Sequence, residues 1–145
     1  MSTKEIQEKL VENMKRWQKI EDASMASTGR IMEQTENPLI HLVMEVIQID
    51  SQVHHRVQDF IASTLERAPV SITPEEISQV WEAVEQHIAI EKKMVGFVEE
   101  TLSAIKGKKM VVAEYLLNYL RDDERKHDNL LAALEKVKAG MYPYG

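Results

Sequence analysis

The sequence contains no cysteine, and this absence excludes several kinds of site. Disulfides, thiolate zinc sites, iron–sulfur clusters and cysteine nucleophiles all depend on that residue. No Ser–His–Asp arrangement, glycine-rich phosphate loop or zinc-protease motif is present either. A metal site in this chain would therefore be built from carboxylates and imidazoles, which bind hard and borderline cations without sulfur.

Glycine and proline are also scarce, with five and four residues respectively. They gather at a few points that separate long apolar–polar patterns, and alternation with period 2, typical of half-buried strands, is absent. The positions of glycine and proline and the periodicity of the apolar residues together predict an all-α protein.

Two further absences limit the partners. The net charge is −6 and no basic stripe is present, so nucleic acid and anionic membranes are poor candidates. No uncharged apolar run reaches the ~18 residues that a bilayer span needs, and the polar N-terminus lacks the apolar centre of a signal peptide. We therefore expect a cytoplasmic protein with no nucleic-acid or membrane partner.

What the chain does contain is the composition of one globular domain. It has 145 residues, of which 43% are hydrophobic and 29% charged. A chain of this length buries a real core, and this balance is unlike that of a disordered segment.

Apolar residues at steps of three and four predict four helices, over about 3–36, 38–68, 73–106 and 109–139. Asn37 precedes Pro38 and is a plausible N-cap for the second helix. Thr73-Pro74-Glu75-Glu76 offers an N-cap threonine, a proline at the first helical position and a capping-box glutamate. Gly140 fits the position after the last helix, and we expect an extended tail over 140–145.

The helices form two similar halves, the hairpins 3–68 and 73–139. Residues 17–21 match 87–91, and 47–54 match 120–127, with polar residues at corresponding places. Only about seven residues join the halves, a reach of at most ~25 Å, whereas a crossover along a helix would need ~45 Å. We therefore predict a single four-helix bundle domain of two pseudo-repeated hairpins, connected up-down-up-down or exchanged between the subunits of a dimer.

Each apolar stripe is interrupted by carboxylates or histidines. A carboxylate buried alone costs several kcal/mol, so each of these groups should have a partner. In two antiparallel helices, residues at the same number of positions from the connecting turn lie side by side, since each residue adds about 1.5 Å along the helix axis. Counted in this way, the polar residues of consecutive helices lie at similar heights in the bundle. The residues concerned are Glu21, Asp50, His54, His87, Glu91, Glu124 and His127, with Asp123 one step aside.

A layer of carboxylates and imidazoles inside a bundle is what a di-iron or di-manganese site uses. The spacing of three or four residues places Glu124 with His127, Asp50 with His54, and His87 with Glu91 on common helix faces. We therefore expect these seven residues to be candidate metal ligands, with iron as the metal and manganese or zinc as alternatives.

The segment Asp123-Glu124-Arg125-Lys126-His127 resembles the Asp-Glu-x-x-His signature on the last helix of ferritin-like proteins such as rubrerythrins and bacterioferritins. The resemblance implies that Glu124 and His127 are ligands and that Asp123 hydrogen-bonds a ligand histidine. It also implies bridging roles for Glu91 and Glu21, and a ligand role for His54.

The chain departs from that pattern at Ser51, where the second helix of the family carries a glutamate three residues before its histidine. Either Asp50 substitutes for this glutamate, or the second metal is weak or missing. The segment His87-x-x-x-Glu91 resembles part of the hemerythrin motif, and hemerythrin is a di-iron bundle with the up-down-up-down connection. We rank that family second.

Two functions follow from these patterns. The first is a metal-binding bundle that oxidises iron or reduces dioxygen or peroxide; the same ligands serve oxidases, peroxidases, storage proteins and sensors, so its status as an enzyme stays open. The second is a non-catalytic helical interaction or structural protein, in which the polar layer sets the helix register. A homodimer is expected under either function.

Overall fold

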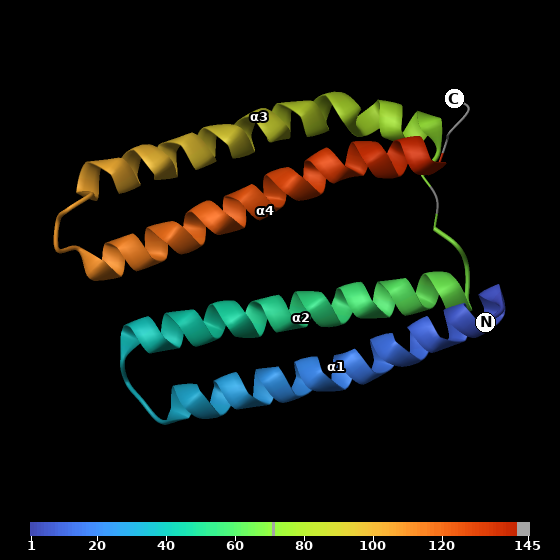
Figure 1. The fold of residues 1–145 in the computed structure, drawn as a ribbon, viewed down its shortest axis with the longest axis horizontal. Helices are drawn as coiled ribbons and strands as arrows, with labels where there is room; N and C mark the ends of the chain where they lie inside the picture. Colours follow the sequence, from blue (N-terminus) through green and yellow to red (C-terminus); the bar gives the residue numbers. More distant parts are fainter. Residues whose placement is uncertain (71, 142–145) are drawn as a thin grey trace. The chain divides into compact units, whose positions relative to one another are not determined.

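The computed structural model describes residues 1–70 and 72–141, and it is all-α over these residues, as the sequence predicts (Figure 1). No strand occurs among them. None of the described helices has the combination of length and apolar character that crossing a membrane requires. The helices are α1 (Thr3–Glu33), α2 (Pro38–Glu66), α3 (Pro74–Ile105) and α4 (Val111–Met141).

Side-chain caps explain where the first three helices begin. Ser2 caps α1 in a capping box with Glu5, and Thr73 caps α3 in a capping box with Glu76. The Asn37 side chain accepts hydrogen bonds from two backbone N–H groups in the first turn of α2. These caps satisfy N–H groups that have no partner within the helix, so the predicted N-caps of α2 and α3 are confirmed.

Helix ends differ from the sequence prediction by a few residues. The helix α1 stops at Glu33 because the chain turns over 34–37, where the Thr35 hydroxyl accepts a hydrogen bond from the Asn37 N–H. Between α3 and α4, Gly107 has φ +78°, a left-handed conformation that favours glycine. Gly140 was expected just beyond the last helix, but α4 continues to Met141, since a single glycine does not force a helix to end. The rest of the expected tail, 142–145, lies outside the described residues.

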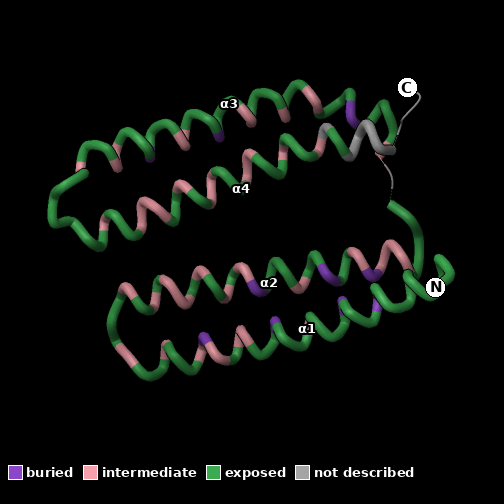
Figure 2. Tube along the Cα trace, viewed as in Figure 1, coloured by how far each residue is buried: buried purple, intermediate pink, exposed green. Residues whose placement is uncertain are grey.

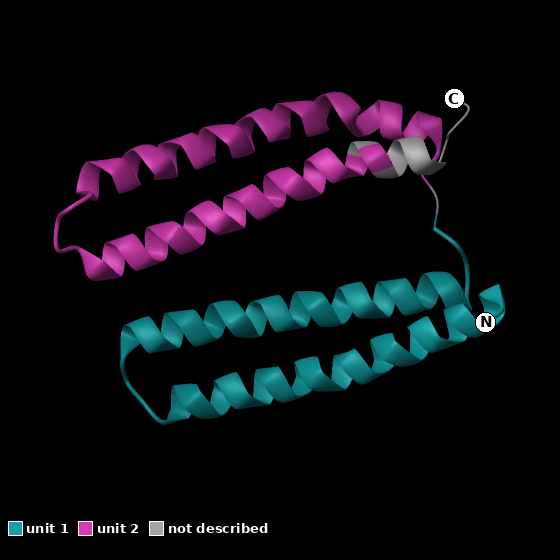
Figure 3. Ribbon diagram, in the orientation of Figure 1, with its two compact units in different colours: residues 1–70 teal, residues 71–145 magenta. Residues whose placement is uncertain are grey.

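The chain divides into two compact units, Met1–Val70 and Ser71–Gly145 (Figure 3). The first unit is a hairpin in which α1 packs on α2, and the second is a hairpin in which α3 packs on α4. These units agree with the two hairpins that the sequence indicates. Closure of the two hairpins into one bundle domain, or their exchange between subunits, stays a prediction.

Buried residues occur on α1, α2 and α3, and the described residues of α4 are half-buried or exposed (Figure 2). In the first unit the apolar core consists of Val11, Met14 and Ala62, with Ile61 and Leu65 packed against it. A hairpin of two helices covers only the seam between them, so its apolar core is small. The rest of the interface between the two helices must be stabilised by polar groups or covered by a further partner.

Part of the apolar stripe predicted for α1 lies outside this seam. Trp17 and Ile20 are among the apolar residues at steps of three and four in this helix, but their exposed fractions are 51% and 66%. Residues at seven-residue spacing, Met14, Glu21 and Thr28, face α2 instead. A stripe wider than one seam is typical of a helix that contacts more than one neighbour, which is the arrangement the bundle prediction requires.

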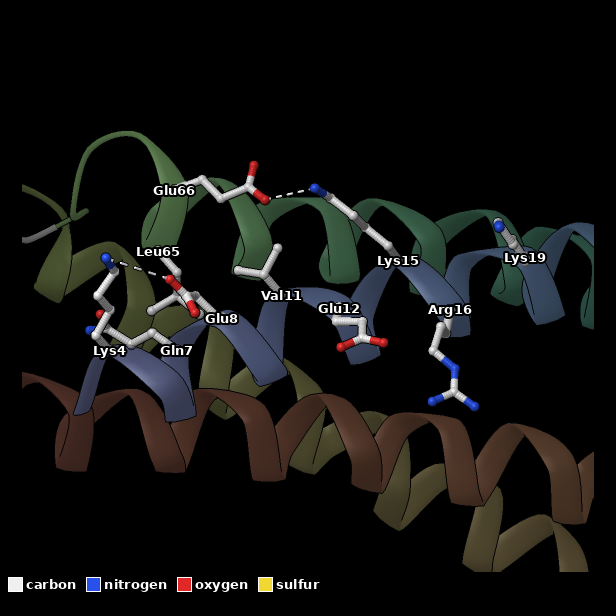
Figure 4. Close-up of a pocket in the computed structure, with 10 residues that line it drawn as sticks. All are labelled: Lys4, Gln7, Glu8, Val11, Glu12, Lys15, Arg16, Lys19, Leu65 and Glu66. Carbon is white, nitrogen blue, oxygen red and sulfur yellow. Dashed lines mark hydrogen bonds and ion pairs between the residues drawn. The ribbon is translucent and has the colours of Figure 1, made fainter. Parts of the chain in front are cut away.

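A groove of about 710 Å³ lies over the apolar end of the first hairpin (Figure 4). Val11 and Leu65 form part of its lining, and charged side chains border it. Lys15 pairs with Glu66 at 2.7 Å, and Lys4 pairs with Glu8 at 3.9 Å. Because carboxylates here are paired with lysines on an open surface, the groove does not concentrate charge of one sign.

The Thr73 cap provides a test of this local account. Replacing it by alanine removes the acceptor for the Glu76 N–H, so Thr73→Ala should lower the free energy of unfolding by about 1 kcal/mol. Urea denaturation followed by circular dichroism measures this change. Ser78→Ala, at an exposed position within α3, is the matched control and should change stability by less than half as much. Equal effects of the two variants would contradict the capping role.

Candidate metal centre

Glu91 is the residue around which the second hairpin is arranged. It lies on the strip of α3 that also carries Ile77, Val84 and Val98 at seven-residue spacing, so the helix directs it toward α4. Its side chain is only 5% exposed. Since an unpaired carboxylate in such a position is unfavourable, its contacts decide what the site can do.

One carboxylate oxygen of Glu91, Oε1, contacts two histidine rings. The His87 Nε2 atom lies 2.9 Å from Glu91 Oε1, within hydrogen-bonding distance, and His127 Nδ1 lies 3.5 Å from the same oxygen. The second oxygen, Oε2, is buried and has no hydrogen-bond partner. The carboxylate is therefore only half satisfied by the protein.

Glu124 on α4 has the same deficiency. Its Oε2 atom is buried without a hydrogen-bond partner, although the side chain as a whole remains 19% exposed. One ligand atom from each of Glu91, Glu124 and His127 lies within 4.8 Å of the other two. The site thus brings together two carboxylates and an imidazole, and the nearest basic group to Glu124 Oε2 is His127 Nδ1 at 3.7 Å, beyond hydrogen-bonding distance.

The two carboxyl groups influence each other's titration. A hydrogen bond between them lowers the pKa of Glu91 and raises the pKa of Glu124, and burial adds to the increase at Glu124. The physical cause is that two facing carboxylates repel unless one proton lies between them, and the raised pKa makes Glu124 the group of the pair that takes up a proton more readily. A divalent cation between the oxygens would relieve the same repulsion.

Asp123 orients His127. Its Oδ2 atom lies 3.4 Å from His127 Nε2, while its Oδ1 atom forms an ion pair with Lys126 Nζ at 2.8 Å. The contact leaves His127 Nδ1 directed toward Glu91 and Glu124. A carboxylate on the far nitrogen of a histidine is the usual support of a metal-binding imidazole, as the sequence resemblance implies for Asp123.

An apolar pocket of about 440 Å³ adjoins the site. Glu124 forms part of its wall, next to Met94, Phe97, Val98 and Leu120. These apolar side chains border one side of Glu124, and burial contributes to the raised pKa of its carboxyl group. A small uncharged molecule can approach Glu124 from this side.

The first hairpin contains a related but different cluster. Glu21 on α1 is buried, and its Oε1 atom lies 3.4 Å from His54 Nδ1 on α2. The Gln58 Nε2 group donates a hydrogen bond to the same oxygen at 3.5 Å. The sequence prediction had placed Glu21 and His54 in one layer, and the structure brings these two together.

Asp50 does not join that cluster. Its side chain is half-buried, and it makes no hydrogen bond or ion pair with any residue of the described chain. The neighbouring position carries Ser51, which is buried and lies 3.0 Å from the Ser24 hydroxyl, Oγ to Oγ. The role of Asp50 as a substitute for the missing glutamate stays a prediction.

Gln58 and Ser24 were not singled out from the sequence. Gln58 is 3% exposed and lies one turn after His54, between that histidine and Ile61 on the same stripe. Its position on the stripe was the available signal, but a neutral amide attracts less notice than a carboxylate. Ser24 gives no such signal, because serine is common on any helix face.

Comparison with protein-family models, with curated proteins and with solved structures finds no match to this chain. The structure shows four helices and a carboxylate–histidine cluster in the second hairpin, and membership of the ferritin-like family stays a prediction.

The facing carboxylates predict a specific pH dependence of the metal-free protein. A raised folded-state pKa means that protonated Glu124 stabilises the fold, and that this contribution is lost as pH rises from the ordinary value of 4.5 through the raised pKa. The lowered pKa of Glu91 acts only below 4.5, outside this window. With chelator present, Glu124→Gln should therefore have a melting temperature a few degrees above wild type near neutral pH.

Thermal denaturation monitored by circular dichroism across this pH window measures the effect. Glu82→Gln, which removes an exposed carboxylate from α3, is the matched control and should follow the wild-type curve. A melting temperature of Glu124→Gln equal to or below wild type near neutral pH would show that the two carboxylates do not repel each other.

Proposed function

We propose that the α3–α4 hairpin binds a divalent metal ion through Glu91, Glu124 and His127. The observation that supports this proposal is the pair of buried, unpartnered oxygens, Glu91 Oε2 and Glu124 Oε2. Buried polar atoms in folded proteins almost always have partners, and two facing carboxylates can share only a cation or a proton.

The chemistry of the donor set favours a particular group of metals. Two carboxylates and an imidazole suit iron(II) and manganese(II), with zinc(II) as an alternative. A cation of charge +2 balances the two carboxylates when both are ionised. His87, whose Nε2 contacts Glu91 Oε1, is available either as a further ligand or as the group that holds Glu91 in place.

The ferritin-like resemblance points to iron and to redox function. Bound iron would supply one-electron chemistry with dioxygen or peroxide. The protein residues would bind and orient: Glu91 and Glu124 neutralise the ion, and Asp123 holds the imidazole of His127. The apolar pocket beside Glu124 is open to the surface, and a small uncharged molecule could approach the site from this side.

A second candidate is the non-catalytic one, in which the polar cluster only specifies how the helices pair. It is favoured by the contacts of Glu91 Oε1 with two imidazoles, which give that oxygen partners within the protein. It is also favoured by exposed apolar side chains such as Phe97 and Leu130, which are typical of a surface that binds another protein. This candidate predicts that metal has no effect on stability.

Metal content distinguishes the two candidates. After anaerobic loading with iron(II) and gel filtration, plasma mass spectrometry of the full chain should find iron in a ratio of about one per chain. The Glu91→Gln/His127→Gln double variant should lose at least nine-tenths of this iron, because two ligands are removed. Glu82→Gln/His55→Gln, which makes the same changes outside the cluster, should retain it.

Stability gives an independent readout. A ligand present at 100 times its dissociation constant stabilises the folded state by about 2.7 kcal/mol, so iron(II) should raise the melting temperature of wild type but not of the double variant. The proposal would be overturned if iron(II), manganese(II) and zinc(II) all failed to bind and to stabilise wild type. The hairpin would then carry a buried polar cluster with a structural role.

A further inference from the structure

We infer that Ser51 and Gln58 determine which hairpin binds metal, and that the first hairpin binds none. This inference depends on the proposed function of the second hairpin. It starts from the likeness between the two units: His54 Nδ1 lies 3.4 Å from Glu21 Oε1, and His127 Nδ1 lies 3.5 Å from Glu91 Oε1. The carboxylate–imidazole pair is therefore common to both hairpins, and it does not by itself create a site.

The first difference is at the position three residues before the histidine. In the second hairpin this residue is Glu124, which supplies the second carboxylate. In the first hairpin it is Ser51, whose hydroxyl is engaged with the hydroxyl of Ser24 at 3.0 Å. The first hairpin thus lacks the facing negative charge that would attract a divalent cation.

The second difference is at the position four residues after the histidine. Gln58 occupies it in the first hairpin and donates its amide N–H to Glu21 Oε1. Leu131 occupies it in the second hairpin and has no polar group to offer Glu91. A neutral donor within the protein partly satisfies Glu21, whereas Glu91 keeps an oxygen that only a proton or a cation can satisfy.

These two differences between the hairpins affect the same buried carboxylate–histidine cluster. Ser51 removes a ligand, and Gln58 supplies a hydrogen bond in its place. The oxygen of the Gln58 amide is itself buried without a partner, so a cation held between Glu21 and Gln58 is the competing arrangement. The inferred arrangement has one cation per chain, held in the second hairpin, with the first hairpin as a hydrogen-bonded counterpart.

The direct test is to convert the first hairpin into the second. The full-length Ser51→Glu/Gln58→Leu variant restores the facing carboxylate and removes the competing amide. Loaded anaerobically with iron(II), it should show a twofold rise in iron per chain over wild type. Adding Glu21→Gln to this variant should return the content to the wild-type value, because the new site then loses its α1 ligand.

Glu21→Gln in the wild-type background is the second measurement. Under the inference its iron content equals that of wild type, and this outcome supports the inference even if the Ser51→Glu/Gln58→Leu variant does not fold. A fall in iron on Glu21→Gln would overturn it, since the first hairpin would then contribute a ligand, as the dinuclear prediction and the competing Glu21–Gln58 arrangement both require.

The outcomes separate this inference from the proposed function. Absence of iron in wild type contradicts the proposed function itself. Iron in wild type, combined with an unchanged content in a Ser51→Glu/Gln58→Leu variant that has native helicity by circular dichroism, contradicts only the roles of Ser51 and Gln58. Matched measurements with zinc(II) test whether the doubled capacity depends on the metal.

Discussion

The burial of one carboxylate, Glu91, is the constraint on which the second hairpin depends. A charged group in the seam between two helices loses its hydration, and the protein must replace that hydration with specific partners. His87 and His127 do so for one oxygen, while the other oxygen faces a second carboxylate. The local arrangement of α4 follows from this, because Glu124, His127 and Asp123 all act on the same few atoms. Glu91 is therefore the position at which packing and protonation are coupled, and under the proposed function the binding of a metal ion is coupled to both.

Comparison of the hairpins explains how similar sequences produce different sites. Both units place a glutamate on the first helix against a histidine on the second. In one unit the surrounding groups are neutral hydrogen-bonding side chains, Ser51 and Gln58, and in the other they are a carboxylate and a leucine. Hydrogen bonds satisfy a buried carboxylate without a change of charge, whereas a second carboxylate creates a requirement for a proton or a cation. We infer that these two side chains account for the difference between the two clusters.

Much of the fold could be predicted from the sequence, because its determinants are local. Helix starts at Asn37 and Thr73 follow from hydrogen bonds between a side chain and the next turn of backbone. Helix ends were less accurate, as at Gly140, since a glycine permits a helix to end without requiring it. The apolar face of α1 was wider than its interface with α2. The reason is that the apolar face of a helix reflects all the neighbours that the helix packs against and not only one.

The sequence by itself determined the four helices, the two hairpins and the presence of carboxylates and histidines on apolar stripes. These features depend on spacing along one helix, where the distance between residues is known from helix geometry. Only the tertiary structure decided that Glu21 meets Gln58, that Asp50 stays apart, and that Glu91 and Glu124 each keep a carboxylate oxygen without a hydrogen-bond partner. Such contacts join atoms on different helices, and they depend on axial register and side-chain rotation, which the packing of one helix on another sets.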